Sequence, residues 1–379
     1  MDFRLSKQYE LLCKMYREFA ENEVKPLAKE VDEEERFPVE TVQKLACYGF
    51  MGIPIPKKYG GQGADNLAYA MAVEELSKVC GTTGVIVSAH TSLCAAPILE
   101  YGTEEQKQKY LPDLASGKKL GAFGLTEPNA GTDAAGQQTT AIDMGDYYLL
   151  NGSKIFITNA GYADIYIIMA MTDKAAGTRG ISAFILEAEM PGFSVGKKEE
   201  KMGIRGSSTC ELIFDKVQVP KQNLLGKVGR GFGLAMKTLD GGRIGIAAQA
   251  LGLAQGAIDE TVAYTKERRQ FGRPISKFQN TQFMLAEMQA KTEAARLLVY
   301  KAAQFKDAKI PYSVEAATAK LIAAEVAMEV TTKAVQLHGG YGYTREYPVE
   351  RMMRDAKITE IYEGTSEVQK MVIAGNLLR

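Results

Sequence analysis

The chain has 379 residues, of which 46% are hydrophobic and 24% charged, a composition typical of a globular protein with ample length for a buried core. Lys and Arg (46) balance Asp and Glu (46), which argues against a dominant surface for nucleic acid or for an anionic membrane. Two histidines and five scattered cysteines without a Cys-x-x-Cys pair exclude a His-rich metal site and a zinc ribbon, so we expect no metal.

The first third of the chain is predicted to be helical. Apolar residues over 5–19 recur at steps of three and four, which places them on one helical face. Further helices are expected from Pro38 to Gly49 and over 67–79. Thr103 and Gln106 have the spacing of a capping box, which predicts the start of another helix.

The pattern changes to that of β-strands near Gly121. Asn151-Gly152 stands between two β-favouring runs, and this pair is a strong hairpin signal because both turn positions need positive φ. Later strand-like runs cover 165–171, 181–186 and 211–219. The middle of the chain is therefore predicted to be a compact β unit.

The helical period returns from about Gly231 and persists to the end. Long helices are expected over 281–305 and 314–335, and a last segment over 349–378 contains Gly364. Long helices with short connections pack as an antiparallel bundle. The predicted fold class is multi-domain α+β, with these domains: an N-terminal α-helical domain at 1–120, a middle β-barrel-like domain at 121–227 and a C-terminal four-helix bundle at 228–379.

The location is predicted from the lack of targeting features. We find no apolar run near the ~20 residues of a membrane span, and the start, MDFRLSKQYE, has neither a secretory core nor a transit pattern. Scattered cysteines fit reduced thiols. We therefore expect a cytoplasmic protein without a membrane span.

Several segments can carry chemistry, and each also has a plainer structural interpretation. The loop 124–133 offers hydroxyl and N–H groups to a polar ligand, but small polar residues also dominate solvated turns. The glycines of 336–343 fit either close ligand approach or a hinge, and His338 is expected to be a core or loop histidine. Glu363, among apolar residues, is either a desolvated base or a surface residue at a helix kink. No Rossmann fingerprint or P-loop is present in the sequence.

The order and spacing of five segments resemble the acyl-CoA dehydrogenase family along essentially the whole chain. The segments are GLTEPNAGTD at 124–133, FITN at 156–159, RRQFG at 268–272, QLHGGYG at 336–342 (followed by Arg351 and Asp355) and YEGT at 362–365. The stretches 203–209 and 240–245 look most like the short-chain branch, which acts on butyryl-CoA. The start at Met1 without a transit peptide suggests a bacterial member.

The resemblance implies a flavoenzyme that converts butyryl-CoA to crotonyl-CoA, or runs in reverse, and exchanges electrons with electron-transferring flavoprotein. It also implies FAD as cofactor and a homotetramer. By resemblance, FAD contacts come from Phe123, Leu125, Thr126, Gly131, Thr132, Phe156, Ile157, Thr158, Arg268, Gln270, Phe271, Gln279, Thr365 and Glu367, and from Gln336, Gly339 and Gly340 of the neighbouring subunit. The positions that meet substrate are Thr132, Asp240, Arg243, Tyr362, Glu363 and Gly364.

The resemblance assigns Glu363 as the base that removes the Cα proton while a hydride goes to flavin N5. Some branches of the family carry the base just before the arginine of the Asp-x-x-Arg segment, but that position here is Gly242, which has no side chain. Many relatives have a tryptophan where this chain has Phe156, and the chain contains no tryptophan. This departure leaves the details of the electron acceptor open.

Three alternatives remain at this point. The enzyme can act on acyl-CoA thioesters of another length or branching. It can be an oxidase or monooxygenase on the same fold, although the large C-terminal extension expected of acyl-CoA oxidases is missing. It can also be a non-enzymatic helical binding protein that keeps the fold.

Overall fold

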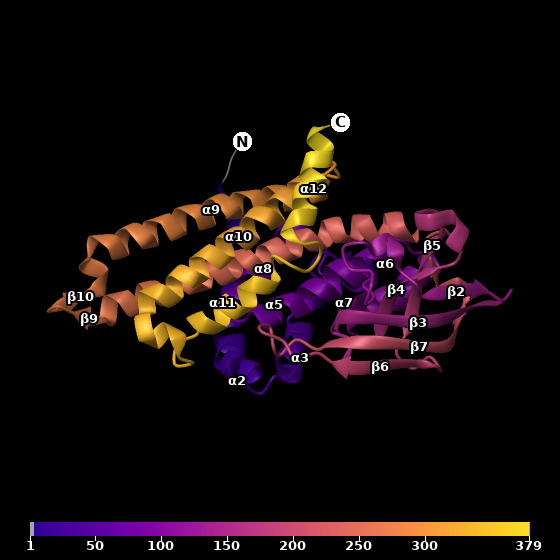
Figure 1. The fold of residues 1–379 in the computed structure, drawn as a ribbon, viewed down its shortest axis with the longest axis horizontal. Coiled ribbons are helices and arrows are strands. Elements are labelled where there is room, and N and C mark those ends of the chain that lie inside the picture. The colour runs from indigo at the N-terminus through magenta and orange to yellow at the C-terminus, as the bar shows by residue number, and fades with distance from the viewer. Residues whose placement is uncertain (1–3, 379) are drawn as a thin grey trace.

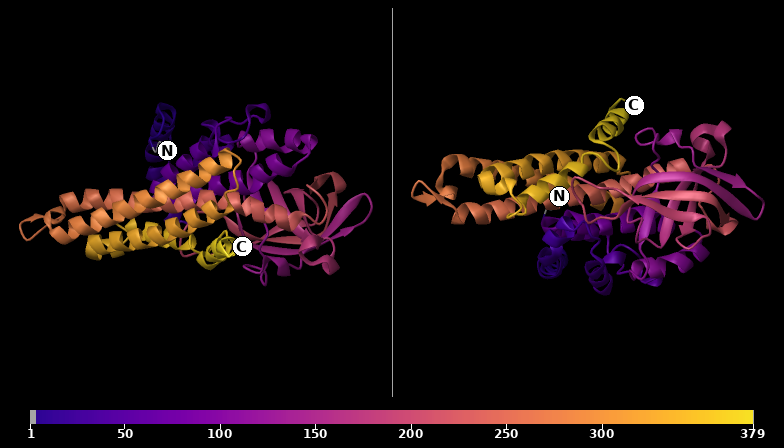
Figure 2. Two further views of the ribbon diagram at one scale, coloured as in Figure 1. Left: turned by 90° about the horizontal axis from the view of Figure 1, so that it is seen from above. Right: turned by 60° about the horizontal axis from the view of Figure 1, so that its bottom comes forward.

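Helices from both ends of the chain pack together beside a β-rich middle part in the computed structural model, which describes residues 4–378 (Figure 1). Both further views place the N-terminal helices against one side of the C-terminal bundle, with the strands at one end (Figure 2). A single apolar core combines residues of both helical parts. The predicted architecture of helical, β and helical domains is confirmed, and 1–120, 121–227 and 228–379 remain our proposed domain limits.

The N-terminal helices follow the predicted pattern. Their bounds are α1 Lys7–Phe19, α2 Ala28–Glu33, α3 Val39–Cys47, α4 Asn66–Val79, α5 Gly81–Ser88, α6 Ala96–Tyr101 and α7 Glu104–Ala115. The capping box is present: Thr103 accepts from the Gln106 N–H, and the Gln106 side chain accepts from the Thr103 N–H. A π-helical segment, Ala89–Ala95, joins α5 to α6 without a break.

This joined segment is a long apolar helix. Residues Gly81–Tyr101 form the only helix within 4–378 that is long and apolar enough to cross a membrane, with a mean hydropathy of 1.3. Thr, Ser and His residues interrupt the apolar run, so the sequence pattern alone does not indicate a helix of this length. In the structure 89% of its most apolar stretch is buried inside the protein, so it packs as a core helix.

The middle part is an eight-stranded sheet in the order β6-β7-β3-β2-β4-β5-β8, with β1 parallel to β4. Aromatic contacts such as Tyr148–Phe184 join strands that are distant in this order, so the sheet curls around its own apolar core. The strands are β1 Gly121–Gly124, β2 Thr140–Asp143, β3 Tyr147–Thr158, β4 Ile165–Met171, β5 Ile181–Glu187, β6 Phe193–Lys198, β7 Thr209–Pro220 and β8 Leu224–Leu225.

The predicted hairpin at Asn151-Gly152 is wrong. Strand β3 runs through both residues, and the turn lies earlier, at Gly145, where φ is +94°. Asn151 instead accepts a hydrogen bond from the Lys216 N–H at 2.9 Å, beside an irregularity in the β3–β7 pairing. Gly152 is required for another reason: a Cβ there would lie 2.6 Å from the Thr139 hydroxyl oxygen.

The C-terminal part is a bundle built around the 37-residue helix α8, Gly231–Glu267. Its first turns pack on β5, so one helix links the sheet to the bundle. A short hairpin follows, β9 Arg269–Gln270 and β10 Arg273–Pro274. The remaining helices are α9 Gln279–Asp307, α10 Ser313–His338, α11 Val349–Ile358 and α12 Ser366–Leu377.

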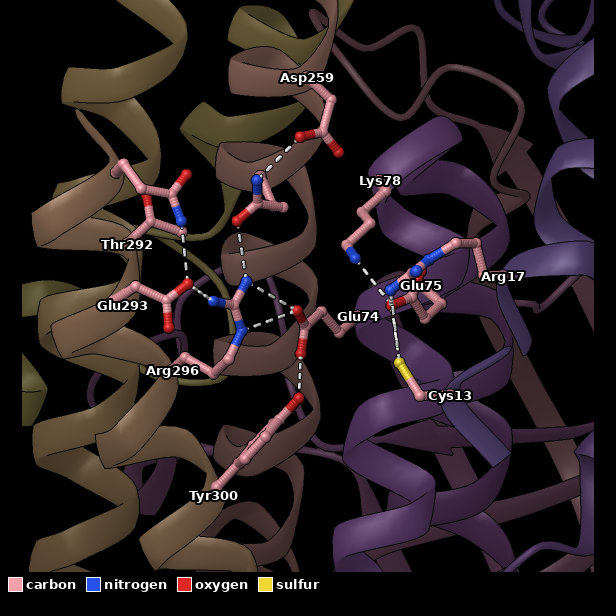
Figure 3. Close-up of polar contacts among 12 residues, drawn as sticks. Cys13, Arg17, Glu74, Glu75, Lys78, Asp259, Thr292, Glu293, Arg296 and Tyr300 are labelled. Carbon is pink, nitrogen blue, oxygen red and sulfur yellow. Dashed lines mark hydrogen bonds and ion pairs between the residues drawn. The ribbon is translucent and has the colours of Figure 1, made fainter. Parts of the chain in front are cut away.

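Two neighbouring glutamates of α4 fasten it to helices on both sides (Figure 3). Glu74 and Glu75 are each only 2% exposed. Glu74 pairs with Arg296 of α9 at 3.0 Å and accepts from the Tyr300 hydroxyl at 2.7 Å. Glu75 pairs with Arg17 of α1 at 3.1 Å. Buried carboxylates with this many partners hold the N-terminal helices against the bundle.

Candidate active site

Glu363 lies in the short connection between α11 and α12. Its φ is +50° and that of Gly364 is +90°, so two consecutive residues have left-handed backbone. Thr365 then caps α12 by accepting from the Val368 N–H. Glycine suits this conformation, whereas a glutamate must be held in it by its surroundings.

The Glu363 carboxylate points at the position on α8 that has no side chain. Its Oε2 is fully enclosed and has no hydrogen-bond partner among residues 4–378. A Cβ on Gly242 would lie 2.0 Å from this oxygen. Burial raises the pKa of Glu363 to about 8, and the positive charges of Lys320 and Arg243 oppose this rise. The site therefore contains a desolvated carboxyl that is a much stronger base than an exposed one.

Asp240 and Arg243 lie one turn apart on α8 and bind each other. The Arg243 Nη1 donates to Asp240 at 2.5 Å, and the Ser313 hydroxyl donates to the other Asp240 oxygen at 2.7 Å. Arg243 is 4% exposed, and its Nε has no hydrogen-bond partner among the described residues. A buried guanidinium with an open N–H can bind a further acceptor.

The Tyr362 hydroxyl has a structural partner. It donates to the side-chain oxygen of Gln249 on α8, and the Gln249 amide donates to the Gly81 carbonyl at 2.9 Å. The predicted substrate-binding position is thus half-buried, with its hydroxyl holding the Glu363 loop to α8 and α5. Gln249 was not singled out from the sequence, because an isolated glutamine in an Ala-rich helix gives no signal.

The loop 124–133 begins beside the same region. Phe123 and Leu125 are 9% and 8% exposed and belong to one apolar cluster with Leu93. A methyl group of Leu93 lies 2.8 Å from where a Cβ of Gly242 would be. Leu93 is therefore close to the position that the Glu363 carboxylate faces and shares an apolar cluster with the base of the loop. Thr126 is half-buried, while Gly131 and Thr132 are exposed at the end of the loop.

Phe156 is presented by an irregularity in strand β3. The pairing of β3 with β7 shifts register between Lys154 and Ile157. Phe156 in that interval has a φ of +59° and is 59% exposed, whereas Ile157 is 2% exposed. The neighbouring Ile155 N–H donates to the Thr126 carbonyl at 2.9 Å, which joins the strand to the loop. An exposed aromatic ring on a strained backbone is a feature expected where a ligand is contacted.

A buried ion pair beneath this loop was not found from the sequence. Lys154 is fully buried, and its ammonium binds Glu127 at 2.7 Å and the carbonyl of Leu125 at 3.1 Å. Glu127 in turn accepts from the backbone N–H of Thr139 at 3.0 Å. Burial lowers the pKa of Lys154 to about 8. This pair fixes the shape of the loop from behind.

The remaining predicted FAD residues form a second patch at the other end of the bundle. An open hollow of about 490 Å³ is lined by Arg268, Gln270, Gln336, Gly339 and Gly340, among others. Phe271 nearby is 93% exposed, and Gln279 is exposed at the first position of α9. Residues predicted to come from two subunits are thus neighbours in one chain.

The length of α8 separates the two patches. Arg243 and Arg268 are 25 positions apart on and just after this helix, which at ~1.5 Å per residue is a separation of about 37 Å. The two groups of residues therefore lie far apart along one chain.

Neither histidine is positioned for catalysis. His90 accepts from the Gly121 N–H at 3.0 Å through Nδ1 and contacts the Leu114 carbonyl at 3.1 Å through Nε2. His338 is 2% exposed and stacks on Tyr264, so the expectation of a core histidine is confirmed. Across 4–378 there is also no group of three or more His, Cys, Asp or Glu side chains able to hold a metal ion.

Comparison with family models matches three successive parts of the chain. Residues 6–118 match the N-terminal domain of acyl-CoA dehydrogenase, 122–217 the middle domain and 229–378 the C-terminal domain. A short-chain specific acyl-CoA dehydrogenase of Clostridium acetobutylicum is 67% identical over the full length of both chains.

Two solved structures have nearly the same fold. Butyryl-CoA dehydrogenase from Megasphaera elsdenii is 56% identical, with a TM-score of 0.98 and full coverage of both chains. A chain in a structure described for the electron transferring flavoprotein of Acidaminococcus fermentans is 59% identical, with a TM-score of 0.99 and full coverage of both chains.

Proposed function

Since the chain belongs to the acyl-CoA dehydrogenase family, we propose that it oxidises butyryl-CoA to crotonyl-CoA, or catalyses the reverse reduction. It is an oxidoreductase, and its cofactor is FAD. The observation that carries the proposal is the enclosed, unpartnered Oε2 of Glu363 beside Gly242. The alternative family position for the base, on α8, is occupied by Gly242, which has no side chain.

The residues around the loop 124–133 fit a flavin. Phe156 exposes an aromatic ring from a strained backbone, and Thr132 exposes a hydroxyl at the loop end. Phe123, Leu125 and Ile157 supply apolar surface, and Thr126 and Thr158 supply hydroxyls. Bound FAD supplies an acceptor for the two electrons of the Cβ hydride.

The chain's own residues account for the proton. Glu363 removes it from the Cα of the thioester, and Oε2 receives it. Burial favours this transfer because the carboxylate gains free energy by becoming neutral in an apolar pocket. Leu93 and Phe123 exclude water, and the backbone N–H of Glu363 donates to the thioester oxygen as negative charge develops there.

Substrate contacts follow from the same geometry. Arg243, with its free Nε, and Asp240 meet the acyl-CoA from α8, while Tyr362 and Gly364 shape the loop around the reacting carbons. Thr132 contacts the pantetheine as well as the flavin. Thr365 and Glu367, at the start of α12, add FAD contacts.

The second patch explains why a single subunit is insufficient. We assign Arg268, Gln270, Phe271 and Gln279, with Gln336, Gly339 and Gly340, to the adenosine end of FAD bound in a neighbouring subunit. This arrangement follows from the separation along α8 and fits a homotetramer. Electrons are exchanged with electron-transferring flavoprotein in the bacterial cytoplasm.

The test is reduction of the enzyme-bound flavin under anaerobic conditions. Butyryl-CoA should bleach the oxidised-flavin absorbance of the wild type, and Glu363→Gln should slow bleaching by roughly 10²- to 10⁴-fold while retaining FAD. The matched control is Glu287→Gln, whose exposed carboxylate pairs with Lys333 at 3.1 Å. Full activity of Glu363→Gln would remove its assigned role. Bleaching only by longer or branched thioesters would overturn the substrate, and rapid peroxide formation in air would overturn the acceptor.

A further inference from the structure

Lys320 of α10 is a fully buried cation close to the proposed base. It is 0% exposed, and its ammonium donates to the carbonyl oxygen of Gly364 at 2.7 Å. Lysine is almost never fully buried unless it is paired, because removing its charge from water is costly. The burial of Lys320 therefore indicates that its surroundings stabilise a positive charge there.

Lys320 and Gln369 together hold the backbone on which the base stands. The Gln369 amide donates to the carbonyls of Glu363 at 3.2 Å and Gly364 at 2.8 Å. Both carbonyls belong to residues with left-handed φ. A non-glycine residue in this conformation is strained and persists only where its surroundings impose it. Three donated hydrogen bonds provide that constraint.

Several charged groups act on Lys320. The negative ones are Glu363 and Glu360 in the loop and Glu367 on α12, and Arg243 on α8 is the positive one. Burial lowers the pKa of Lys320 to about 8, and the charge of Glu363 has the largest opposing effect. The effect is mutual, since Lys320 and Arg243 are the two cations that lower the pKa of Glu363.

A second fully buried lysine, Lys154, differs from Lys320 in the partner of its ammonium group. Lys154 binds its own carboxylate, Glu127, at 2.7 Å. Among residues 4–378, Lys320 has no carboxylate within ion-pair distance; its hydrogen bond goes to a carbonyl. Its charge is therefore not cancelled by a dedicated partner and acts on the unpartnered carboxylate of Glu363.

We propose that Lys320 is a positioning residue for the reaction. Its ammonium fixes the Gly364 carbonyl, and with it the left-handed backbone that aims Glu363 at Gly242, while its charge favours the ionised form of that carboxylate. This inference rests on the proposed function, because it assigns a use for Glu363 as base. Lys320 is on a separate helix, 44 positions before Gly364 in the chain.

The experiment compares purified holoenzymes of wild type, Lys320→Met, Gln369→Met and Lys333→Met. Lys333 is the control, because it is on the same helix but pairs with Glu329 and Glu287 at the surface. The carboxylic-acid band of Glu363 is identified by infrared difference against Glu363→Gln and titrated with pH. Flavin bleaching by butyryl-CoA is measured over the same pH range.

Lys320→Met should raise the pH midpoint of the Glu363 band by about one pH unit. At pH values below the midpoint, the ionised fraction of Glu363 is then roughly tenfold lower than in wild type. The bleaching rate should fall by the same factor, while FAD content stays constant. Gln369→Met keeps the charge, so its rate should fall without a change in midpoint. Lys333→Met should match wild type in both.

An unchanged midpoint and rate in Lys320→Met would overturn the proposal. If Lys320→Met does not fold, Gln369→Met tests whether hydrogen bonds to the Glu363 and Gly364 carbonyls position the base. An unchanged bleaching rate in Gln369→Met would overturn that claim, and a reduced rate at a constant midpoint would support it. A wild type that is not reduced by any acyl-CoA would overturn the proposed function instead, and the infrared midpoints would still test the effect of Lys320 on Glu363.

Discussion

Two glutamates with buried carboxylate oxygens, Glu75 on α4 and Glu363 in the loop before α12, show how partners decide what a carboxylate does. Glu75 contacts Arg17 at 3.1 Å and Lys78 at 2.7 Å (Figure 3). Burial acts to raise its pKa, but these two cations outweigh burial and the net shift is downward. Glu75 is therefore an ionised structural anchor.

Glu363 has the opposite balance. Burial raises its pKa to about 8, and the nearby cations Lys320 and Arg243 only partly offset this effect. Neither cation forms an ion pair with it, and Oε2 has no hydrogen-bond partner among the described residues. Withholding direct partners from a buried carboxylate leaves it free to take a proton from a bound molecule.

The strongest test of the anchored side is Arg296→Met. This change leaves the buried Glu74 carboxylate without its guanidinium partner, and we expect unfolding to become easier by about 3–5 kcal/mol. Chemical denaturation of the holoenzyme measures the loss. The control is Lys291→Met, which breaks an exposed pair with Glu329 and should cost less than about 1 kcal/mol. Equal losses in the two variants would contradict the distinction between buried and exposed pairs.

On the reactive side, Gly242→Ala should separate activity from stability. The new methyl carbon would lie 2.0 Å from Glu363 Oε2 and 2.8 Å from a methyl carbon of Leu93, and both belong to the ends of flexible side chains that can move away at little cost in stability. A displacement of ~1 Å can reduce the rate about 10²-fold. We expect that loss in butyryl-CoA-dependent bleaching with an unchanged melting temperature. Gly233→Ala, whose Cβ would meet no atom within 4 Å, is the matched control. Retained activity in Gly242→Ala would show that the observed carboxylate position is unnecessary.

The smallest expected effect is on thermal stability, to which Glu363 and Glu75 should contribute with opposite dependence on pH. The pKa of Glu363 is higher in the folded protein, about 8 against 4.5, so its contribution to stability is complete below pH 4.5 and is lost as the pH rises to 8. Glu363→Gln should therefore melt a few degrees above wild type at pH 8 and equal it near pH 4.

Glu75→Gln should behave in the opposite way. The folded pKa of Glu75 is lowered, so its contribution is present above pH 4.5 and is lost as the pH falls. The variant should melt below wild type at pH 8, and the gap should narrow under acid conditions. Melting curves at both pH values measure the two signs, and a common sign would refute the comparison.

The sequence alone was sufficient for much of the architecture. Strand β4 has the bounds expected from its apolar run, Ile165–Met171, and the capping box at Thr103 forms as predicted. The hairpin failed at Asn151-Gly152, because a local turn signal lost to pairing with β7, which lies about 60 residues away. Local patterns predict local structure, but they cannot weigh such distant pairing against it.

By itself, the sequence determined that position 363 carries a carboxylate and that position 242 carries no side chain, because both are matters of residue type. Only the tertiary structure decided which residues hold the Glu363 loop and which charges act on its carboxylate. Lys320 and Gln249 reach the loop from positions 44 and 113 residues away from their partners. Such contacts depend on how helices are oriented against one another, and a buried lysine or glutamine in an Ala-rich helix has no local pattern that reveals its partner.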